Sequence, residues 1–284
     1  MSFRNGLPQI SRYTFGTGNV NDKSNTEHMR VTRAAMEAGV WFHSSDAYGG
    51  GGTFEVLKAA FKEAPSQRPF CIFKVDGQGP DKLRAIVEKS IDGTGVERAD
   101  VAQVCGNPSP ETLLPGSPLH ATMVELQEKG LVGSYVLENF YGFSPNTIKA
   151  LDRDLFDGYI YYYNVINREV SNELFDKLQE KNAPQLALRS IGGKLDSFCW
   201  TDDREEMERE LEAIYADSGA PSRLDFRYRF PLSNPNVRTS IGATTKLDHL
   251  KELLEADRNF APLPAEIVAR IEALQRKWFA VKGL

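Results

Sequence analysis

The sequence predicts an α/β protein made of a single (β/α)8 TIM barrel with an extra C-terminal helix. Three observations predict it. Short apolar runs alternate with helical stretches, the runs number eight, and the length of 284 residues suits one barrel of about 250 residues. Such alternation requires parallel strands that are joined by right-handed helical crossovers.

Eight short apolar runs are typical of buried strands. In chain order they are Tyr13–Phe15, Val40–Phe42, Phe70–Phe73, Val101–Val104, Ser134–Leu137, Tyr159–Tyr162, Leu186–Leu188 and Thr239–Ile241.

Between the runs, apolar residues recur at the 3.6-residue spacing of helices. The clearest such stretches are Thr26–Ala38, Phe54–Phe61, Leu83–Ile91, Met123–Glu128 and Leu174–Gln179. A final stretch from Pro264 to Val281 starts at a proline and carries apolar residues at helical spacing, which predicts the extra helix on the outside of the barrel.

An open doubly wound sheet is the alternative fold. A dinucleotide-binding sheet of that kind places G-x-G-x-x-G after its first strand, whereas here Gly16-Thr17-Gly18 leads only to Asn19-Val20. The chain contains no linker-like or low-complexity segment, so we expect residues 1–284 to form one domain.

Composition and charge exclude several classes of partner. The net charge is −5, from 34 basic and 39 acidic residues that are mixed along the chain, which disfavours nucleic acid as a partner. No apolar stretch is long enough for a membrane span and no secretion signal leads the sequence, so we expect no membrane association and a cytoplasmic location. Cys71, Cys105 and Cys199 lack C-x-x-C spacing, which disfavours a disulfide framework or a zinc site. The expected partner is a small-molecule substrate, and the sequence does not indicate an oligomeric state.

In a barrel of this class the functional groups lie where strands end. The second predicted strand leads into Phe42-His43-Ser44-Ser45-Asp46-Ala47-Tyr48-Gly49, the third ends at Lys74, the fourth ends at Cys105, and the fifth leads into Glu138-Asn139. In this order the strand ends resemble those of the aldo-keto reductase superfamily, which read F-D-T-A-x-x-Y-G, K, D-x-x-Q-x-H and S-N. Tyr163-Asn164-Val165-Ile166-Asn167-Arg168 and Ser240-Ile241-Gly242-Ala243-Thr244-Thr245 extend the resemblance over nearly the whole chain.

The resemblance implies an NADP(H)-linked oxidoreductase that acts on a small carbonyl or sugar-like substrate. In the family a tyrosine protonates the carbonyl oxygen, and a lysine, a histidine and an aspartate assist it. Tyr48 matches the tyrosine and Lys74 the lysine, whereas His43 stands at the aspartate position and Cys105 at the histidine position. The chain is therefore similar to a divergent family member with an altered catalytic tetrad.

The resemblance also implies the residues that hold the cofactor. Glu138, Asn139 and Tyr163 correspond to positions near the nicotinamide, and Gly242, Thr244 and Lys246 to the adenosine-phosphate loop. Glu138 stands where the family has serine, and an alkyl side chain, Ile160, replaces a glutamine. Each hydrogen bond left unmade in a buried site costs about 1–3 kcal/mol, so we expect the adenosine end to bind more strongly than the nicotinamide end.

His43, Lys74 and Cys105 are expected to form a cluster, because their strands are consecutive or one apart. Loss of the aspartate predicts that the pKa of Lys74 is lower than in an intact tetrad, low enough for Lys74 to accept protons near neutral pH. The positive surroundings predict a nucleophilic thiolate at Cys105. The four glycines after Tyr48 lack the G-K-[ST] ending of a phosphate loop and predict a pliable substrate loop. Two alternative functions remain: a lyase, dehydratase or isomerase that moves protons without hydride, and a non-catalytic ligand-binding protein.

Overall fold

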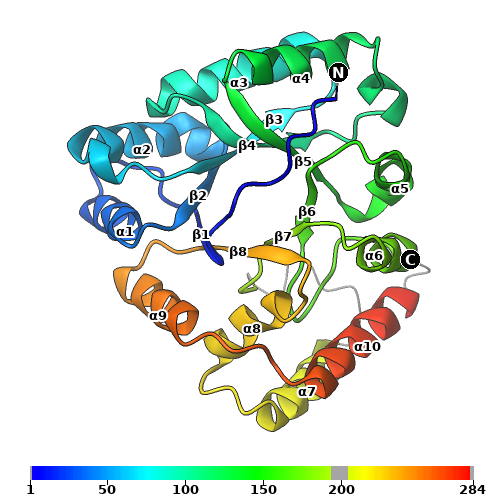
Figure 1. The fold of residues 1–284 in the computed structure, drawn as a ribbon. Coiled ribbons are helices and arrows are strands. Elements are labelled where there is room, and N and C mark those ends of the chain that lie inside the picture. Colours follow the sequence, from blue (N-terminus) through cyan, green and yellow to red (C-terminus); the bar gives the residue numbers. More distant parts are fainter. Residues whose placement is uncertain (1, 193–203, 282–284) are drawn as a thin grey trace.

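The computed structural model describes residues 2–192 and 204–281, so Cys199 lies outside the described residues. Its eight strands close into one parallel barrel in sequence order, β1 to β8. This confirms the predicted TIM barrel, and Figure 1 shows the helices arranged around it. The strands are β1 Tyr13–Gly16, β2 Trp41–Ser44, β3 Cys71–Asp76, β4 Ala99–Cys105, β5 Val132–Glu138, β6 Gly158–Tyr162, β7 Gln185–Leu188 and β8 Val237–Ala243.

Each predicted helical stretch falls on a helix of the structure. These helices are α1 Thr26–Glu37, α2 Gly52–Glu63, α3 Pro80–Thr94, α4 Pro118–Glu128, α6 Asn172–Glu180 and α10 Ala265–Val281. The helices α5 Ser144–Asp152, α7 Arg204–Asp217, α8 Arg223–Leu232 and α9 Leu247–Arg258 were not predicted. Short 3-10 turns complete the described elements: η1 Tyr48–Gly51, η2 Pro65–Gln67, η3 Pro110–Leu113 and η4 Tyr141–Phe143.

Helix ends follow local sequence signals. The side chain of Asn25 accepts hydrogen bonds from the first turn of α1, and Ser117 and Ser171 do the same for α4 and α6. Prolines occupy the first position of α3 and α4, where the missing N–H has no helical partner. The predicted C-terminal helix, α10, packs against α7 on the outside of the barrel (Figure 1).

The inside of the barrel is divided into an apolar layer and a polar layer. The apolar layer lies in the lower and middle barrel, and it contains inward-facing residues from seven strands: Trp41, Ile72, Val101, Val136, Ile160, Leu186, Leu188 and Ile241. Above it, toward the carboxyl ends of β2 to β5, the next inward positions along each strand are polar: His43, Lys74, Gln103 and Glu138. The apolar layer thus forms the floor of the site described below.

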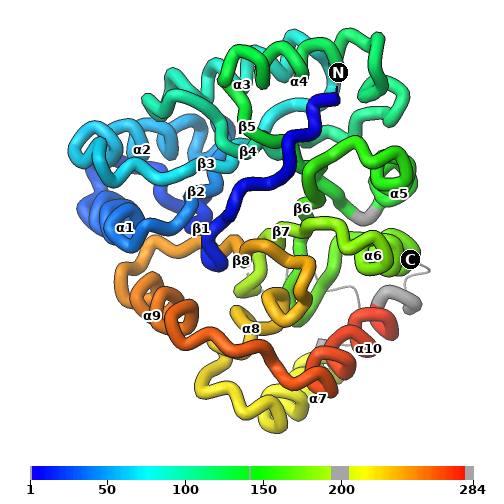
Figure 2. Tube along the Cα trace, in the orientation of Figure 1, coloured from blue at the N-terminus to red at the C-terminus, as the bar shows by residue number. Residues whose placement is uncertain are grey.

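The N-terminal segment, residues 2–12, runs across the amino-terminal end of the barrel (Figures 1 and 2). The Ser134 hydroxyl donates to the carbonyl of Gly6 over 2.7 Å, and the Trp41 amide donates to the hydroxyl of Ser11 over 2.9 Å. Ile10 packs into the apolar layer from below. This segment therefore closes the end opposite the polar layer.

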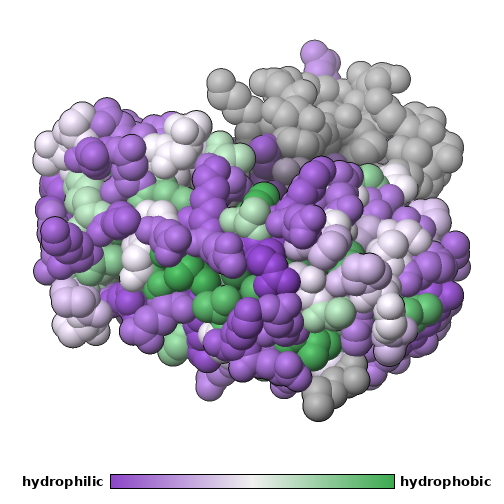
Figure 3. Space-filling view, turned by 90° about the horizontal axis from the view of Figure 1, so that it is seen from above, coloured by the Kyte–Doolittle hydropathy of each residue, from purple (hydrophilic) through white to green (hydrophobic). Residues whose placement is uncertain are grey.

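Hydrophilic residues cover most of the face in Figure 3, and apolar residues occur there in small groups between them. In the part of the chain that the structure describes, no helix combines the length and the apolar character that a membrane span requires.

Candidate active site

A cavity of about 550 Å³ opens at the carboxyl ends of the strands. Three of the four predicted catalytic residues, His43, Tyr48 and Lys74, line it. The other lining residues are glycines, apolar residues and a few polar groups: Gly16, Gly18, Asn19, Tyr162, Leu188, Arg189, Ile191, Gly192, Ile241, Gly242 and Ala243. A tyrosine, a lysine and an imidazole in one concave site are groups that move or stabilise protons.

Tyr48 is followed by a tight turn that three glycines form. Gly49, Gly50 and Gly51 all have left-handed φ angles, of 56°, 63° and 98°, which only glycine adopts readily. A Cβ atom on Gly49 would lie 2.2 Å from the Cβ of Asn21, in the loop after β1. The turn therefore packs directly on that loop, and the pliability expected of this segment stays a prediction.

Lys74 forms an ion pair that the sequence did not predict. Its Nζ atom lies 3.0 Å from Oε1 of Glu138, and the two side chains are 22% and 4% exposed. Burial by itself lowers the pKa of Lys74, but the charge of Glu138, assisted by Tyr48, outweighs burial and raises the pKa above its usual value. The expected lowered pKa of Lys74 is therefore wrong, because a carboxylate on β5 supplies the charge that position 43 lacks.

Gln103, a fully buried residue of β4, joins this ion pair to His43. Its Nε2 atom donates to Oε1 of Glu138 over 2.6 Å, and its Oε1 atom lies 2.7 Å from Nε2 of His43. A carboxylate can only accept, so the amide oxygen of Gln103 faces His43 and the imidazole carries its proton on Nε2. Burial, assisted by the charge of Lys74, lowers the pKa of His43 to about 3, so the ring is neutral near neutral pH.

Cys105 lies beside the same group of residues, but its thiol is not activated. Its Sγ atom is 3.5 Å from the carbonyl oxygen of Gln103 and 3.8 Å from the Nε2 atom of that residue. Burial raises the pKa of the Cys105 thiol, and the charge of Glu138 raises it further, against a smaller opposite effect of Lys74. The expected reactive thiolate is therefore wrong. The structure gives Cys105 contacts to Gln103 rather than to His43.

The Tyr48 phenol keeps its proton near neutral pH. Burial raises the pKa of Tyr48, whereas the positive charge of Lys74 acts in the opposite direction. Asp46, two residues earlier, pairs with Lys89 of α3 at 2.9 Å and takes no part in the cluster. The protonated phenol and the charged ammonium thus face one cavity.

None of the three residues expected near the nicotinamide, Glu138, Asn139 and Tyr163, belongs to the lining of this cavity. Asn139 is buried, donates from Nδ2 to the carbonyl of Glu169 over 2.5 Å, and accepts at Oδ1 from Thr147 over 2.7 Å. Tyr163 is also fully buried, and its ring packs against Phe175 of α6 outside the barrel. The structure brings neither side chain into the cavity, and Glu138 uses its carboxylate on Lys74 and Gln103.

Tyr162 and Arg189 take the place of those residues at the cavity wall. The guanidinium of Arg189 lies 5.0 Å from the centre of the Tyr162 ring. The alternating directions of side chains along a strand were the available signal, because they turn Tyr162 inward and its neighbours outward. Residue type alone did not distinguish Tyr162 from Tyr163.

The expected phosphate loop is divided between the cavity and the outside. Gly242 lines the cavity, and a Cβ atom there would lie 2.1 Å from Cδ1 of Ile191. Thr244 accepts a hydrogen bond from the amide of Lys246 over 3.0 Å, just before α9 begins. Neither Thr244 nor Lys246 belongs to the cavity lining.

A carboxylate already lies at the start of α9. The amide of Leu247, the first residue of this helix, donates to Oε1 of Glu27 in α1 over 3.1 Å. Glu27 thus places a negative charge where the helix dipole favours an anion.

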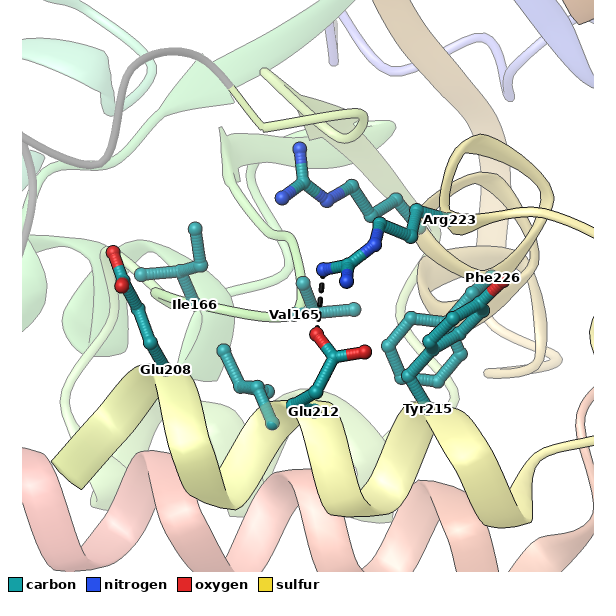
Figure 4. Close-up of a pocket in the computed structure, with 9 residues that line it drawn as sticks. Val165, Ile166, Glu208, Glu212, Tyr215, Arg223 and Phe226 are labelled. Carbon is teal, nitrogen blue, oxygen red and sulfur yellow. Dashed lines mark ion pairs between the residues drawn. The ribbon is translucent and has the colours of Figure 1, made fainter. Parts of the chain in front are cut away.

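A second cavity, of about 290 Å³, lies between α7, α8 and the loop after β6 (Figure 4). Arg223 and Glu212 form an ion pair of 2.5 Å across it, and the rings of Tyr215 and Phe226 lie side by side at one end (Figure 4). None of the predicted site residues lies there. Among the described residues, no group of three or more histidine, cysteine or acidic side chains could hold a metal ion.

The sequence matches the model of the Aldo/keto reductase family over residues 12–276. A comparison with curated proteins gave no match. Among solved structures, the holo form of aldo-keto reductase AKR11C1 from Bacillus halodurans is 18% identical, with a TM-score of 0.75 and coverage of 95% of this chain and 96% of that chain. An aldo-keto reductase from Klebsiella pneumoniae in complex with NADPH is 17% identical, with a TM-score of 0.70 and coverage of 95% and 91%. The thermostable aldo-keto reductase Tm1743, in complex with the inhibitor epalrestat, is 21% identical, with a TM-score of 0.71 and coverage of 94% and 95%.

Proposed function

The chain belongs to the aldo/keto reductase family, and from that premise we propose that it is an NADP(H)-linked oxidoreductase that reduces a small carbonyl or sugar-like substrate. The active unit is the barrel, which we take to be one domain over residues 1–284. One observation carries the proposal: Tyr48 and a charged Lys74, paired with Glu138 at 3.0 Å, face the same cavity.

In this function Tyr48 donates a proton to the carbonyl oxygen. The phenol holds its proton near neutral pH because burial raises its pKa, and Lys74 stabilises the phenolate that forms when the proton leaves. His43 lines the cavity as a neutral imidazole whose Nε2 is taken by Gln103. Its Nδ1 atom is therefore an acceptor, which suits a substrate with a hydroxyl group near its carbonyl.

The cavity wall fits a dinucleotide in part. Gly16, Gly18, Gly192 and Gly242 line it, so backbone atoms can approach a ligand closely there. Of the expected contacts, Gly242, Thr244 and Lys246 would hold the adenosine end, and Arg189 adds a positive charge at the wall. NADP(H), when bound, supplies the hydride.

The proton-moving alternative requires a lysine that loses its proton near neutral pH. The ion pair with Glu138 opposes that loss because it raises the pKa of Lys74. This favours the reductase over the lyase, dehydratase or isomerase. It also gives the cavity a catalytic arrangement that a ligand-binding protein does not need.

The test uses the purified chain with NADPH and a panel of aldehydes, ketones and aldoses. We expect NADPH to bind in the micromolar range by fluorescence titration, and its absorbance to fall when an accepted carbonyl is added. Absence of NADPH and NADH binding would contradict the proposal.

A further inference from the structure

We propose that Glu138 is the positioning residue that keeps Lys74 charged beside Tyr48, so that the counter-charge of the catalytic lysine lies on β5 instead of at position 43 on β2. The catalytic part of this inference rests on the proposed function. The charge pairing of Glu138 with Lys74 rests on the contacts of the described side chains alone.

The first step is that a largely buried ammonium needs a counter-charge. The side chain of Lys74 is 22% exposed and lies directly above the apolar layer of the barrel. An isolated charge in such surroundings is strongly disfavoured relative to the neutral amine. Among the described residues, Glu138 is the only carboxylate within 4.0 Å of this ammonium.

The second step is that Glu138 is fixed in place. Its side chain is only 4% exposed, and the oxygen that faces Lys74 also accepts the 2.6 Å hydrogen bond from Gln103. Gln103 is held in turn by His43 through its amide oxygen. Glu138 therefore cannot turn toward solvent without breaking two hydrogen bonds, and it acts through Lys74 rather than on the substrate.

The third step is that position 43 provides no compensating charge. His43 pairs with Ile72 in the β2–β3 register, so Lys74 stands two residues further along the neighbouring strand, at the diagonal position. A carboxylate at position 43 would approach Lys74 from this side. The imidazole that occupies it is neutral and forms its hydrogen bond with Gln103.

The test moves the carboxylate from position 138 to position 43. Glu138→Gln keeps the shape and removes the charge, and the double variant His43→Asp with Glu138→Gln restores a carboxylate on the other side of Lys74. Glu125→Gln, which breaks partly exposed ion pairs with Arg84 and Lys129 outside the cavity lining, is the matched control. The readout is competitive acetylation of Lys74 with acetic anhydride between about pH 7 and pH 11, measured by mass spectrometry.

We expect Lys74 of the wild type and of the Glu125 variant to react only at the alkaline end of this range. In Glu138→Gln the reactivity near pH 8 should rise at least about tenfold, since one pKa unit changes the neutral fraction tenfold. The double variant should return toward the wild-type profile. Identical profiles for the wild type and Glu138→Gln would overturn the proposal.

Carbonyl reduction gives the second readout. The alkaline limb of the kcat/KM profile should move to lower pH in Glu138→Gln and return in the double variant, which loss of structure alone would not produce. A shift in acetylation without reductase activity in any of the proteins would contradict the proposed function and leave the counter-charge role in place. If Glu138→Gln does not fold, recovery of folded protein in the double variant supports the proposal, and failure of both contradicts it.

Discussion

The Nζ atom of Lys74 and the Oε1 atom of Glu138 lie 3.0 Å apart although their strands are not neighbours, since β4 runs between β3 and β5. Gln103 on the middle strand donates to the same oxygen. Side chains from three consecutive strands therefore meet at one atom, which the narrow interior of an eight-stranded barrel allows.

The role of Tyr48 is tested by Tyr48→Phe. Removal of the proton donor should lower turnover on any accepted carbonyl by at least about a hundredfold, the usual size of general acid catalysis. NADPH affinity should change little, and Tyr215→Phe, in the second cavity, should behave like the wild type. Wild-type turnover in the Tyr48 variant would remove the phenol from the mechanism.

The neutral state of His43 predicts a loss of stability in acid. Its pKa in the folded protein is about 3, against an ordinary value of 6.5. Because the unfolded chain takes up this proton first, the contribution of His43 to stability is fully present above about pH 6.5 and is lost as the pH falls toward 3, at about 1.4 kcal/mol per pH unit. Urea unfolding at several pH values should show this slope in the wild type, and it should be smaller in His43→Gln. An equal slope in the two proteins would contradict the prediction.

Cys105 should react slowly with iodoacetamide at neutral pH. Burial and the charge of Glu138 raise the pKa of its thiol, so the reactive thiolate is scarce. Glu138→Gln should speed labelling of Cys105. It should leave Cys71 as slow as before, because burial and Asp100, rather than Glu138, raise the pKa of that buried thiol. Rapid labelling of Cys105 in the wild type near pH 7, read site by site by mass spectrometry, would be the opposite result.

Cofactor preference should depend on Glu27 and Lys246. Glu27→Gln removes a negative charge from the start of α9 and should tighten NADPH more than NADH, by about two- to fivefold, the scale of a charge at a helix terminus. Lys246→Ala should weaken NADPH more than NADH. Fluorescence titrations with the two dinucleotides measure the ratio. Equal changes for the two dinucleotides in both variants would place the extra phosphate of NADPH elsewhere.

Much of the fold could be predicted because its signals are local. Each strand is a short apolar run, and the capping residues Asn25 and Ser171 lie just before the helices α1 and α6. The insertion of two helices, α7 and α8, between β7 and β8 could not be predicted in the same way, because their burial depends on packing against distant parts of the chain.

The residues of the site could be predicted only where the position of a residue at the end of a strand decides whether it reaches the cavity. Tyr48 and Lys74 follow directly from the strand ends, and the structure places them in one cavity. The direction of Tyr163 follows from the alternation of side chains only once the register of the strand is known, because a shift of one residue along a strand turns a side chain to the other face. The partner of Lys74 could not be found either, since contact across non-adjacent strands exists only after the barrel closes.

The segment that crosses the amino-terminal end of the barrel has a kinetic consequence. Residues 2–12 cover that end, and the apolar layer fills the barrel above them, so the described cavity is reached from the carboxyl end alone. If the dinucleotide and the carbonyl substrate enter through this one opening and one of them binds deeper than the other, they cannot exchange independently. The deeper ligand must bind first and dissociate last. Steady-state kinetics with both ligands varied should therefore show a compulsory order of addition, with product inhibition patterns that differ between the two products.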